Sequence, residues 1–300
     1  MNRFRPPRAA WITVVVLGAS AACSKPSRDR TSVPDNLAVF LPADATAVFS
    51  VDLARLRQTQ AWAPLSRLAG DAVAAHLGRT GIRLDDLDLV VAAGAGPSLL
   101  FAASGRFAPA AIETALEREK ASRDIFHGAQ LWTMGENALA AVDGNRIVAG
   151  PAASVRQSLE NTRSGGLPPA LTAAAAAIPA GMPVWGAVSA GFRVSFPDRT
   201  NWRNLNRILG ALQSGGIWAD FDNGVEVQLR GECATAEGAA KLHRQLMGLS
   251  AVARLAAPER SDLWQAVDQI GVEQAGRLLT VQLSLPPQAF DLGVPGGGRP

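Results

Sequence analysis

The chain has 300 residues, of which 29 are Lys or Arg, 26 are Asp or Glu, and two are Cys. Three of the arginines and none of the acidic residues lie in residues 1–22, so the rest of the chain carries 26 charges of each sign and is formally neutral. This balance removes the electrostatic argument for nucleic-acid binding, and two cysteines exclude a disulfide-rich scaffold.

Residues 1–22 have the order of a secretory signal. Arg3, Arg5 and Arg8 form a basic head, Ala9 to Leu17 form an apolar run, and small residues follow as far as Ala22. The apolar stretch is shorter than the roughly 20 residues that a helix needs to cross a bilayer. The pattern therefore predicts an export signal that is removed, rather than a permanent membrane span.

The string Ser20-Ala21-Ala22-Cys23-Ser24 resembles the lipobox of bacterial lipoproteins. The resemblance implies that Cys23 carries the lipid, although Ser20 stands where the pattern prefers an apolar residue. The alternative is ordinary cleavage after Ala21, which would give a soluble periplasmic protein. Acyl chains contribute about 0.8 kcal/mol per buried CH₂, so several of them together would hold the chain on a membrane of the cell envelope.

The remaining chain is predicted to be an α+β protein with antiparallel sheets and helices packed on one face. Residues 23–36 are polar and contain prolines, which predicts a flexible tether between the lipid and the domain. Residues 294–300 are rich in Gly and Pro and are predicted to be a disordered tail. The folded part between them is predicted to consist of two halves, residues 37–167 and 168–293.

Hydrophobic periodicity predicts the elements of the first half in chain order. Strand patterns and helical patterns alternate, Pro64 is expected to break the first helix, and Asp143-Gly144 predicts a tight hairpin turn. The predicted strands are 47–53, 87–93, 99–103, 138–142 and 146–149, and the predicted helices are 54–77 and 109–120.

The second half follows a similar order after the alanine-rich residues 168–178. Asn223-Gly224 predicts a second tight hairpin, while Thr200 and Thr235 are placed as helix caps. The predicted strands are 184–188, 217–221, 225–229 and 279–285, and helices are expected after both caps and over 261–270.

Two pairs of strings indicate a diverged repeat. Leu41-Pro42-Ala43 matches Ile178-Pro179-Ala180, and Gly105-Arg106-Phe107-Ala108 matches Gly231-Glu232-Cys233-Ala234, with a predicted helix after each member of the second pair. The repeat hypothesis predicts that the turns at residues 94–98 and 223–224 occupy equivalent positions, each followed by a helix on the same face of the sheet. The alternative is coincidence in a composition rich in Ala and Gly.

Three segments together resemble a group of bacterial envelope proteins from high-GC genomes. The resemblance is carried by Leu41-Pro42-Ala43-Asp44-Ala45, by Val48-Phe49-Ser50-Val51-Asp52-Leu53 and by Gly105-Arg106-Phe107. It would cover most of the chain after the signal. It implies a location in the envelope and brings no activity with it.

Ala187-Val188-Ser189-Ala190-Gly191 is a degraded form of the nucleophile elbow Gly-x-Ser-x-Gly. A serine hydrolase would use Ser189, Asp220 or Asp222, and His243, which occur in the required chain order. Against this hypothesis, the first glycine is missing, strand-like alternation follows where a helix should start, and His243 lies within a helical pattern.

No metal or cofactor site is predicted. His76, His127 and His243 are too far apart for a local metal motif. The acidic string at residues 85–88 lacks the Gly and Glu of a calcium loop, and Gly94-Ala95-Gly96 lacks the third glycine of a dinucleotide loop.

Cys233 and the scattered tryptophans are interpreted as packing residues rather than as a reactive thiol or a ligand-stacking surface.

The sequence therefore predicts an exported lipoprotein, anchored through Cys23, that binds an envelope protein partner without catalysing a reaction. Catalytic, cofactor-binding and metal-binding residues are predicted to be absent, and Cys23 is the single predicted site. Two alternatives remain: the Ser189 hydrolase, and a periplasmic binding protein for an apolar ligand.

Overall fold

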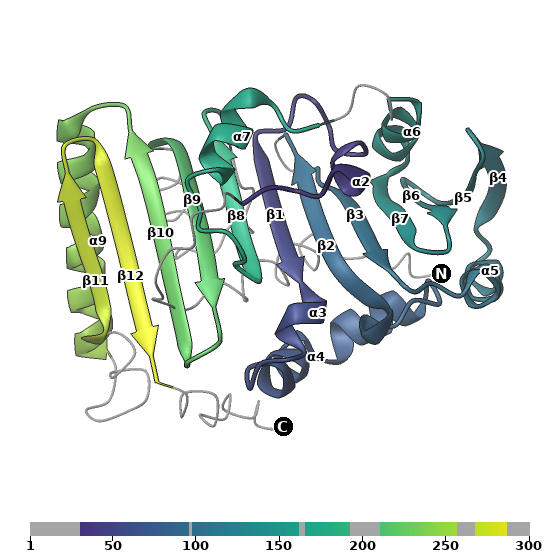
Figure 1. Ribbon diagram of the computed structural model, residues 1–300, viewed down its shortest axis with the longest axis horizontal. Helices are drawn as coiled ribbons and strands as arrows, with labels where there is room; N and C mark the ends of the chain where they lie inside the picture. Colours follow the sequence, from purple (N-terminus) through teal and green to yellow (C-terminus); the bar gives the residue numbers. More distant parts are fainter. Residues whose placement is uncertain (1–30, 96–97, 162–165, 193–210, 257–267, 287–300) are drawn as a thin grey trace, which may run out of the picture.

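A computed structural model describes residues 31–95, 98–161, 166–192, 211–256 and 268–286 of the chain. These residues form one broad, twisted sheet with helices on its faces and at its rim (Figure 1). The expected α+β class with antiparallel strands is confirmed. The predicted signal, the lipidation site Cys23 and the predicted tail at 294–300 lie outside the described residues.

The helices and strands alternate along the chain as follows. The strands are β1 (Ala47–Asp52), β2 (Leu87–Gly94), β3 (Leu100–Gly105), β4 (Ser122–Phe126), β5 (Ala129–Met134), β6 (Asn137–Asp143), β7 (Arg146–Pro151), β8 (Val184–Ser189), β9 (Leu212–Asp220), β10 (Val225–Cys233), β11 (Ile270–Ala275) and β12 (Leu278–Leu285). The helices are α2 (Asp35–Ala38), α3 (Leu53–Leu56), α4 (Trp62–Gly78), the 3-10 helix η1 (Leu84–Asp86), α5 (Pro109–Arg118), α6 (Ala152–Glu160), α7 (Pro169–Ala175) and α9 (Ala236–Ala256).

All twelve described strands belong to one antiparallel sheet, in the order β11-β12-β10-β9-β8-β1-β2-β3-β7-β6-β5-β4. The expectation of separate sheets is therefore wrong. The two predicted halves share one sheet because β1 pairs with β8, from Ala47 opposite Val188 to Val51 opposite Val184. The predicted boundary between residues 167 and 168 falls between α6 and α7 and does not interrupt the sheet.

The order outward from the central β1–β8 pair is similar on the two sides. On one side it is β1-β2-β3-β7-β6, and on the other it is β8-β9-β10-β12-β11. On each side three strands are followed in the chain by a helix, α5 or α9. Only the first side continues, because the hairpin β5–β4 extends it beyond β6.

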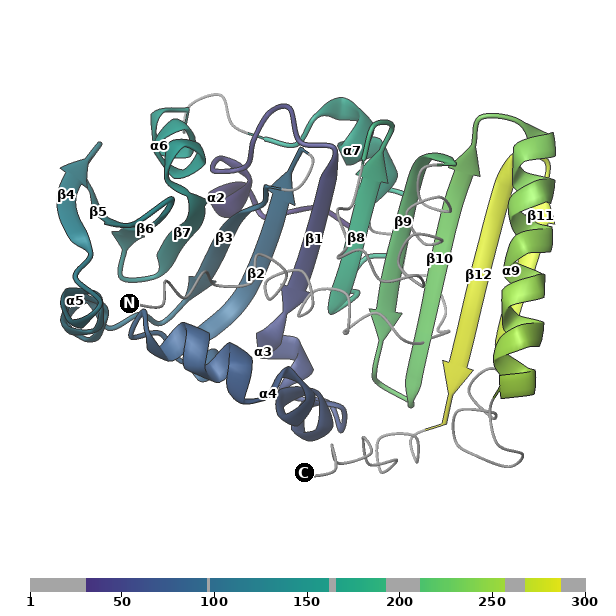
Figure 2. The ribbon, with the colours of Figure 1, turned by 180° about the vertical axis from the view of Figure 1, so that it is seen from behind.

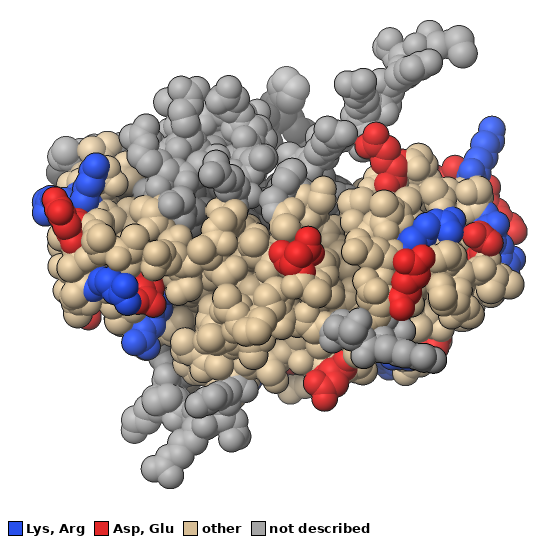
Figure 3. Space-filling view, turned by 90° about the horizontal axis from the view of Figure 1, so that it is seen from above, with Lys and Arg blue, Asp and Glu red and all other residues tan. Residues whose placement is uncertain are grey.

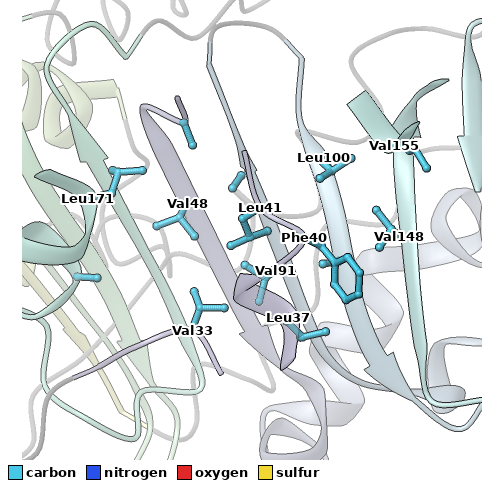
Figure 4. Close-up of a cluster of buried hydrophobic side chains, with 14 of the residues drawn as sticks. Val33, Leu37, Phe40, Leu41, Val48, Val91, Leu100, Val148, Val155 and Leu171 are labelled. Carbon is cyan, nitrogen blue, oxygen red and sulfur yellow. The ribbon is translucent and has the colours of Figure 1, made fainter. Parts of the chain in front are cut away.

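Helices cover both faces of the sheet, which corrects the expectation of helices on one face. Side chains alternate along each strand, so that Leu131 belongs to a core beneath α2, α6 and α7, whereas Trp132 belongs to a second core with α3, α4 and α5. Figure 4 shows the first core, in which Leu37 and Phe40 pack over β2, β3 and β7. A large sheet with both faces buried in this way has two apolar layers rather than one.

Helix α9 packs at the end of the sheet formed by β12 and β11. Its Leu242 lies in a small cluster with Leu279, Val272 and Val281. Val281 is paired with Leu229, and directly opposed residues of antiparallel strands share a face. Leu229 is in turn opposite Ile217, which packs on the α3–α5 core, so α9 lies on the same face as those helices (Figure 2).

The segment before β1 belongs to the fold, which corrects part of the predicted tether at 23–36. Thr31 donates a hydrogen bond from Oγ1 to the carbonyl oxygen of Pro179, 2.5 Å away, and Val33 lies in the first core. Leu37 on α2 is fully buried. The sequence pattern missed this because the segment offers few apolar side chains: Val33 and Leu37 lie four residues apart, with Pro34 between them.

Most predicted elements are confirmed, and three strands, β4, β5 and β11, were missed. The predicted helix 54–77 is broken into α3 and α4, although Pro64 lies in the first turn of α4 rather than at the break. Both predicted tight hairpins are present.

Two further helix predictions fall largely outside the described residues. The helix expected after Thr200 lies outside them as far as residue 210, and Leu212, which was expected on its apolar face, begins β9 instead. The helix expected over 261–270 lies outside them as far as residue 267, and its last residue, Ile270, begins β11.

We predict that Val33→Ala destabilises the protein by about 2 kcal/mol, because it removes two methyl groups from a side chain that is 6% exposed. Urea unfolding, followed by tryptophan fluorescence, measures the change. Ser32→Ala is the matched control: Ser32 is exposed, and we expect its effect to stay within about 0.5 kcal/mol. Equal midpoints for the wild type and Val33→Ala would place residue 33 in a tether after all.

Candidate functional site

The two edges of the sheet differ in what packs beside them. At one edge, helix α9 packs against β11. A two-residue turn, Gly276-Arg277, joins β11 to β12, so Ala275 and Leu278 form a hydrogen-bonded pair. Hydrogen-bonded and non-hydrogen-bonded pairs alternate along antiparallel strands. Val272, three residues before Ala275, is therefore in a non-hydrogen-bonded pair, and its carbonyl points away from β12. Nε2 of His243 on α9 lies 3.3 Å from this carbonyl oxygen, where its N–H tautomer donates. His243 therefore satisfies one outward carbonyl of the β11 edge, where four of the six strand residues are exposed.

The other edge, β4, is open. Residues His127 and Gly128 form the turn to β5 with φ angles of 50° and 83°, the left-handed pair that a tight hairpin needs. Phe126 and Ala129 flank this turn as a hydrogen-bonded pair. The N–H and C=O groups of Ile125, the next residue, therefore point away from β5.

The Asp124 carboxylate forms a hydrogen bond with the outward-facing amide of Ile125 on this edge. Its Oδ1 accepts a hydrogen bond from the Ile125 N–H at 2.8 Å, and its Oδ2 lies 3.4 Å from Nη2 of Arg156 on α6. The Arg156 guanidinium also lies 4.9 Å from the centre of the Phe126 ring. A carboxylate that occupies an outward amide is a device that limits edge-to-edge pairing.

The opposite face of β4 carries a second ion pair and an exposed apolar side chain. Arg123 donates to Glu113 on α5, and its guanidinium lies 6.0 Å from the Trp132 ring centre. Ile125 is 72% exposed. Figure 3 shows basic and acidic residues side by side at this end of the sheet. The β4 edge therefore offers outward-facing backbone groups, one exposed β-branched side chain and charges of both signs.

A carboxyl pair lies at one end of β9 and β10. Asp220 and Glu226 are directly opposite each other, Asp220 is buried, and Oε2 of Glu226 is buried without a hydrogen-bond partner. Burial and the negative charge of Asp220 raise the pKa of Glu226, while a hydrogen bond with Ser284 acts in the opposite direction. Like charges opposed across a strand pair are destabilising, so the pair is a strained feature of the sheet at neutral pH.

The hydrolase triad considered from the sequence is not assembled. Ser189 is opposite Ser214 on β9, so Asp220 lies six residues farther along that strand, roughly 20 Å away at about 3.3 Å per residue.

His243 contacts β11, which is four strands from β8, or roughly 19 Å at about 4.8 Å per strand. The Ser189 hydroxyl instead donates to the Thr46 carbonyl oxygen at 3.4 Å.

The other residues singled out in the sequence have packing or capping contacts. Cys233 is buried, as predicted, and burial raises the pKa of its thiol. Asp86 accepts a hydrogen bond from the Arg83 N–H at the start of η1, and Asp88 pairs with Arg57. Burial lowers the pKa of His76, and Arg79 lowers it further.

The tryptophan interpretation is confirmed for those in the cores, namely Trp132, Trp185 and Trp218. Within the described ranges no group of His, Cys, Asp or Glu is arranged to hold a metal ion.

The open edge was missed in the sequence although signals for it exist. The string from Ser122 to Phe126 ends in Ile125 and Phe126, two residues favoured in strands, and His127-Gly128 is a pair that tolerates positive φ. Three polar residues in five hid the strand, since a strand at an exposed edge needs little apolar surface. Nothing in the local sequence could show that this strand would be the last one in the sheet.

We predict that Ile125→Pro leaves the free energy of unfolding within about 1 kcal/mol of the wild type, because the outward N–H is not part of the sheet's ladder. Asp124→Pro removes a ladder donor and should cost about 3 kcal/mol. Asp124→Ala is the control for the lost carboxylate. Urea titration of the three variants provides the comparison, and an equal cost for both prolines would show that the Ile125 amide points inward.

We predict that Glu226→Gln stabilises the protein by about 1 kcal/mol near neutral pH, because an amide replaces the charge that faces Asp220. A carboxyl whose pKa is raised on folding stabilises the protein fully at low pH, and this contribution is lost as the pH rises through the folded-state pKa. The gain should therefore disappear near pH 4.

Thermal unfolding between about pH 4 and pH 8 tests this. Glu232→Gln removes the same charge from an exposed ion pair on the same strand and should change stability by less than about 0.5 kcal/mol. A gain for Glu226→Gln that did not vary with pH would argue against a raised pKa.

Comparison with known proteins adds to the description of the fold. No protein-family model matches the chain, and no curated protein matches its sequence. A solved structure, crystal form I of TP0453, is similar with a TM-score of 0.52 and 12% sequence identity, over 87% of this chain and 96% of that one. Crystal form III of TP0453 gives a TM-score of 0.51 and 10% identity, over 87% and 98%. At these identities the likeness concerns the fold alone.

Proposed function

We propose that the chain is an exported bacterial lipoprotein, anchored through Cys23 to a membrane of the cell envelope, that works by binding a protein partner and not by catalysis. Export and lipid anchoring are supported by the basic head, the apolar run and the small residues that precede Cys23. In the part of the chain that the structure describes, no helix is long and apolar enough to span a membrane.

The observation that carries the binding role is the open β4 edge. A sheet edge with free N–H and C=O groups is a template for pairing with another chain, and proteins usually cover it. Here α9 packs against β11, and His243 reaches the outward carbonyl of Val272. At β4, in contrast, the outward N–H of Ile125 is held by the adjacent Asp124 carboxylate, and the Ile125 side chain is exposed. This difference between the two edges favours β4 as the surface that a partner uses.

We also propose that the two halves of the chain are related copies. Three observations support this: the strand order outward from β1 and β8, the helix that follows the third strand on each side, and the packing of α5 and α9 on the same face. Within the described residues the β4–β5 hairpin has no counterpart in the second half, where the corresponding segment between α9 and β11 includes residues 257–267, which lie outside the description. An experimental structure with α5 and α9 on opposite faces would contradict the relationship.

The outermost strand of the β4–β5 hairpin supports a role beyond stability. Strand β5 belongs to both cores through Leu131 and Trp132, whereas β4 contributes four exposed residues and a half-buried Phe126. An exposed edge strand brings a risk of aggregation and little burial. Its presence is therefore better explained by a binding role than by packing.

We expect that Cys23→Ala abolishes acylation while leaving the export signal intact, since the thiol of Cys23 is the group that accepts the lipid. Metabolic labelling with a fatty acid, combined with membrane fractionation, compares the wild type with the variant. Cys233→Ala is the matched control, because it removes the other cysteine and should leave labelling unchanged. Wild-type protein that carries no label and fractionates as soluble would show that cleavage after Ala21 occurs instead.

A further inference from the structure

We propose that the β4 edge binds an extended segment of a different protein as an additional antiparallel strand, with a basic residue opposite Asp124 and a β-branched residue opposite Ile125. This inference rests on the proposed binding function and specifies the partner of that same surface. The backbone groups of Arg123 and Ile125 face away from β5 and would form the new ladder. Strand addition of this kind draws affinity from main-chain hydrogen bonds and specificity from the opposed side chains.

A second copy of the chain is disfavoured at this edge in the register that pairs the whole of β4. If two β4 strands pair antiparallel over residues 122–126, the two-fold axis passes through Asp124 and places one carboxylate directly opposite the other. Like charges directly opposed on neighbouring strands are destabilising. The edge is therefore selective against self-association while its main chain remains available.

The position of Asp124 explains the basic residue in the partner. Its carboxylate holds the Ile125 N–H at 2.8 Å, and an incoming carbonyl must replace it there. A lysine directly opposite Asp124 gives the displaced carboxylate a new ionic partner. The contact with Arg156 is long, 3.4 Å, and both side chains are about half exposed, so that contact leaves room for the exchange.

The other face of the strand defines the neighbouring positions. Ile125 presents its exposed side chain beside Arg123, whose guanidinium is already oriented by Glu113 and by the Trp132 ring. A valine opposite Ile125 would cover apolar surface, and an acidic residue opposite Arg123 would add an opposite-charge pair. The edge thus favours a partner strand with the order β-branched, basic, acidic.

Two peptides of equal composition test the proposal on the full-length chain in detergent micelles. The first, acetyl-Thr-Val-Lys-Glu-Thr-amide, places Val opposite Ile125, Lys opposite Asp124 and Glu opposite Arg123 when it pairs antiparallel. The second exchanges Lys and Glu, so that each charge meets a like charge. With fluorescent labels on both, we expect the first to bind at least about fivefold more tightly.

Variants of the edge then identify the site. Ile125→Pro, which should fold, is expected to weaken the first peptide at least about tenfold, because the outward amide is lost and the ring blocks the edge. Asp124→Asn should reduce the difference in affinity between the two peptides, and the part that remains is the contribution of Arg123. Hydrogen exchange of the Ile125 amide should slow when the first peptide is added to the wild type.

Three results would overturn the inference: equal affinity of the two peptides, unchanged binding to Ile125→Pro, or no binding of either peptide at millimolar concentration. None of these results would bear on the proposal of a lipid anchor, which the labelling of Cys23 tests separately. Concentration-dependent dimerisation of the wild type that Ile125→Pro abolishes would instead make a second copy the occupant, and would equally refute the proposal.

Discussion

The antiparallel pairing of β1 with β8 is the contact on which the rest of the structure depends. It joins residues 47–51 to residues 184–188 and so makes one sheet from strands of both halves of the chain. Without it, each half would have an additional edge and two incomplete cores. Because Val48 and Ala187 face one core while Val51 and Val184 face the other, the same pairing holds both apolar layers together.

A single open sheet necessarily has two edges, and the groups that contact each edge decide whether another chain can pair with it. At β11 the chain uses a long helix, and one histidine reaches the outward carbonyl of Val272. At β4 it uses a strand of five residues, ion pairs to α5 and α6, and one carboxylate that holds an outward amide. At β11 the partner of the outward carbonyl comes from a helix packed on the sheet, whereas at β4 the partner of the outward amide is the neighbouring carboxylate, which a competing strand can displace.

Local signals predicted most elements because the physics that forms them is local. Asp143-Gly144 and Asn223-Gly224 supply the backbone freedom of tight turns, and apolar periodicity identifies the central strands and the longer helices. The single sheet could not be predicted in this way, since the β1–β8 pairing joins segments more than 130 residues apart. One available signal was not used: Leu89 to Ala93 is a continuous apolar run, which is typical of a strand buried on both faces.

The candidate site was harder to predict than the fold because it is defined by what lies beside it. Cys23 could be identified from the sequence since export and acylation act on a linear string. The importance of Asp124 and Ile125 arises only when β4 is the last strand, which is a property of the whole topology. If the chain is anchored by a lipid as we propose, copies confined to one membrane surface meet at a high effective concentration. An open edge would then pair with the same edge of another copy unless an interaction disfavoured it. In a self-pairing over residues 122–126 the two Asp124 carboxylates lie opposite each other, and their repulsion disfavours it.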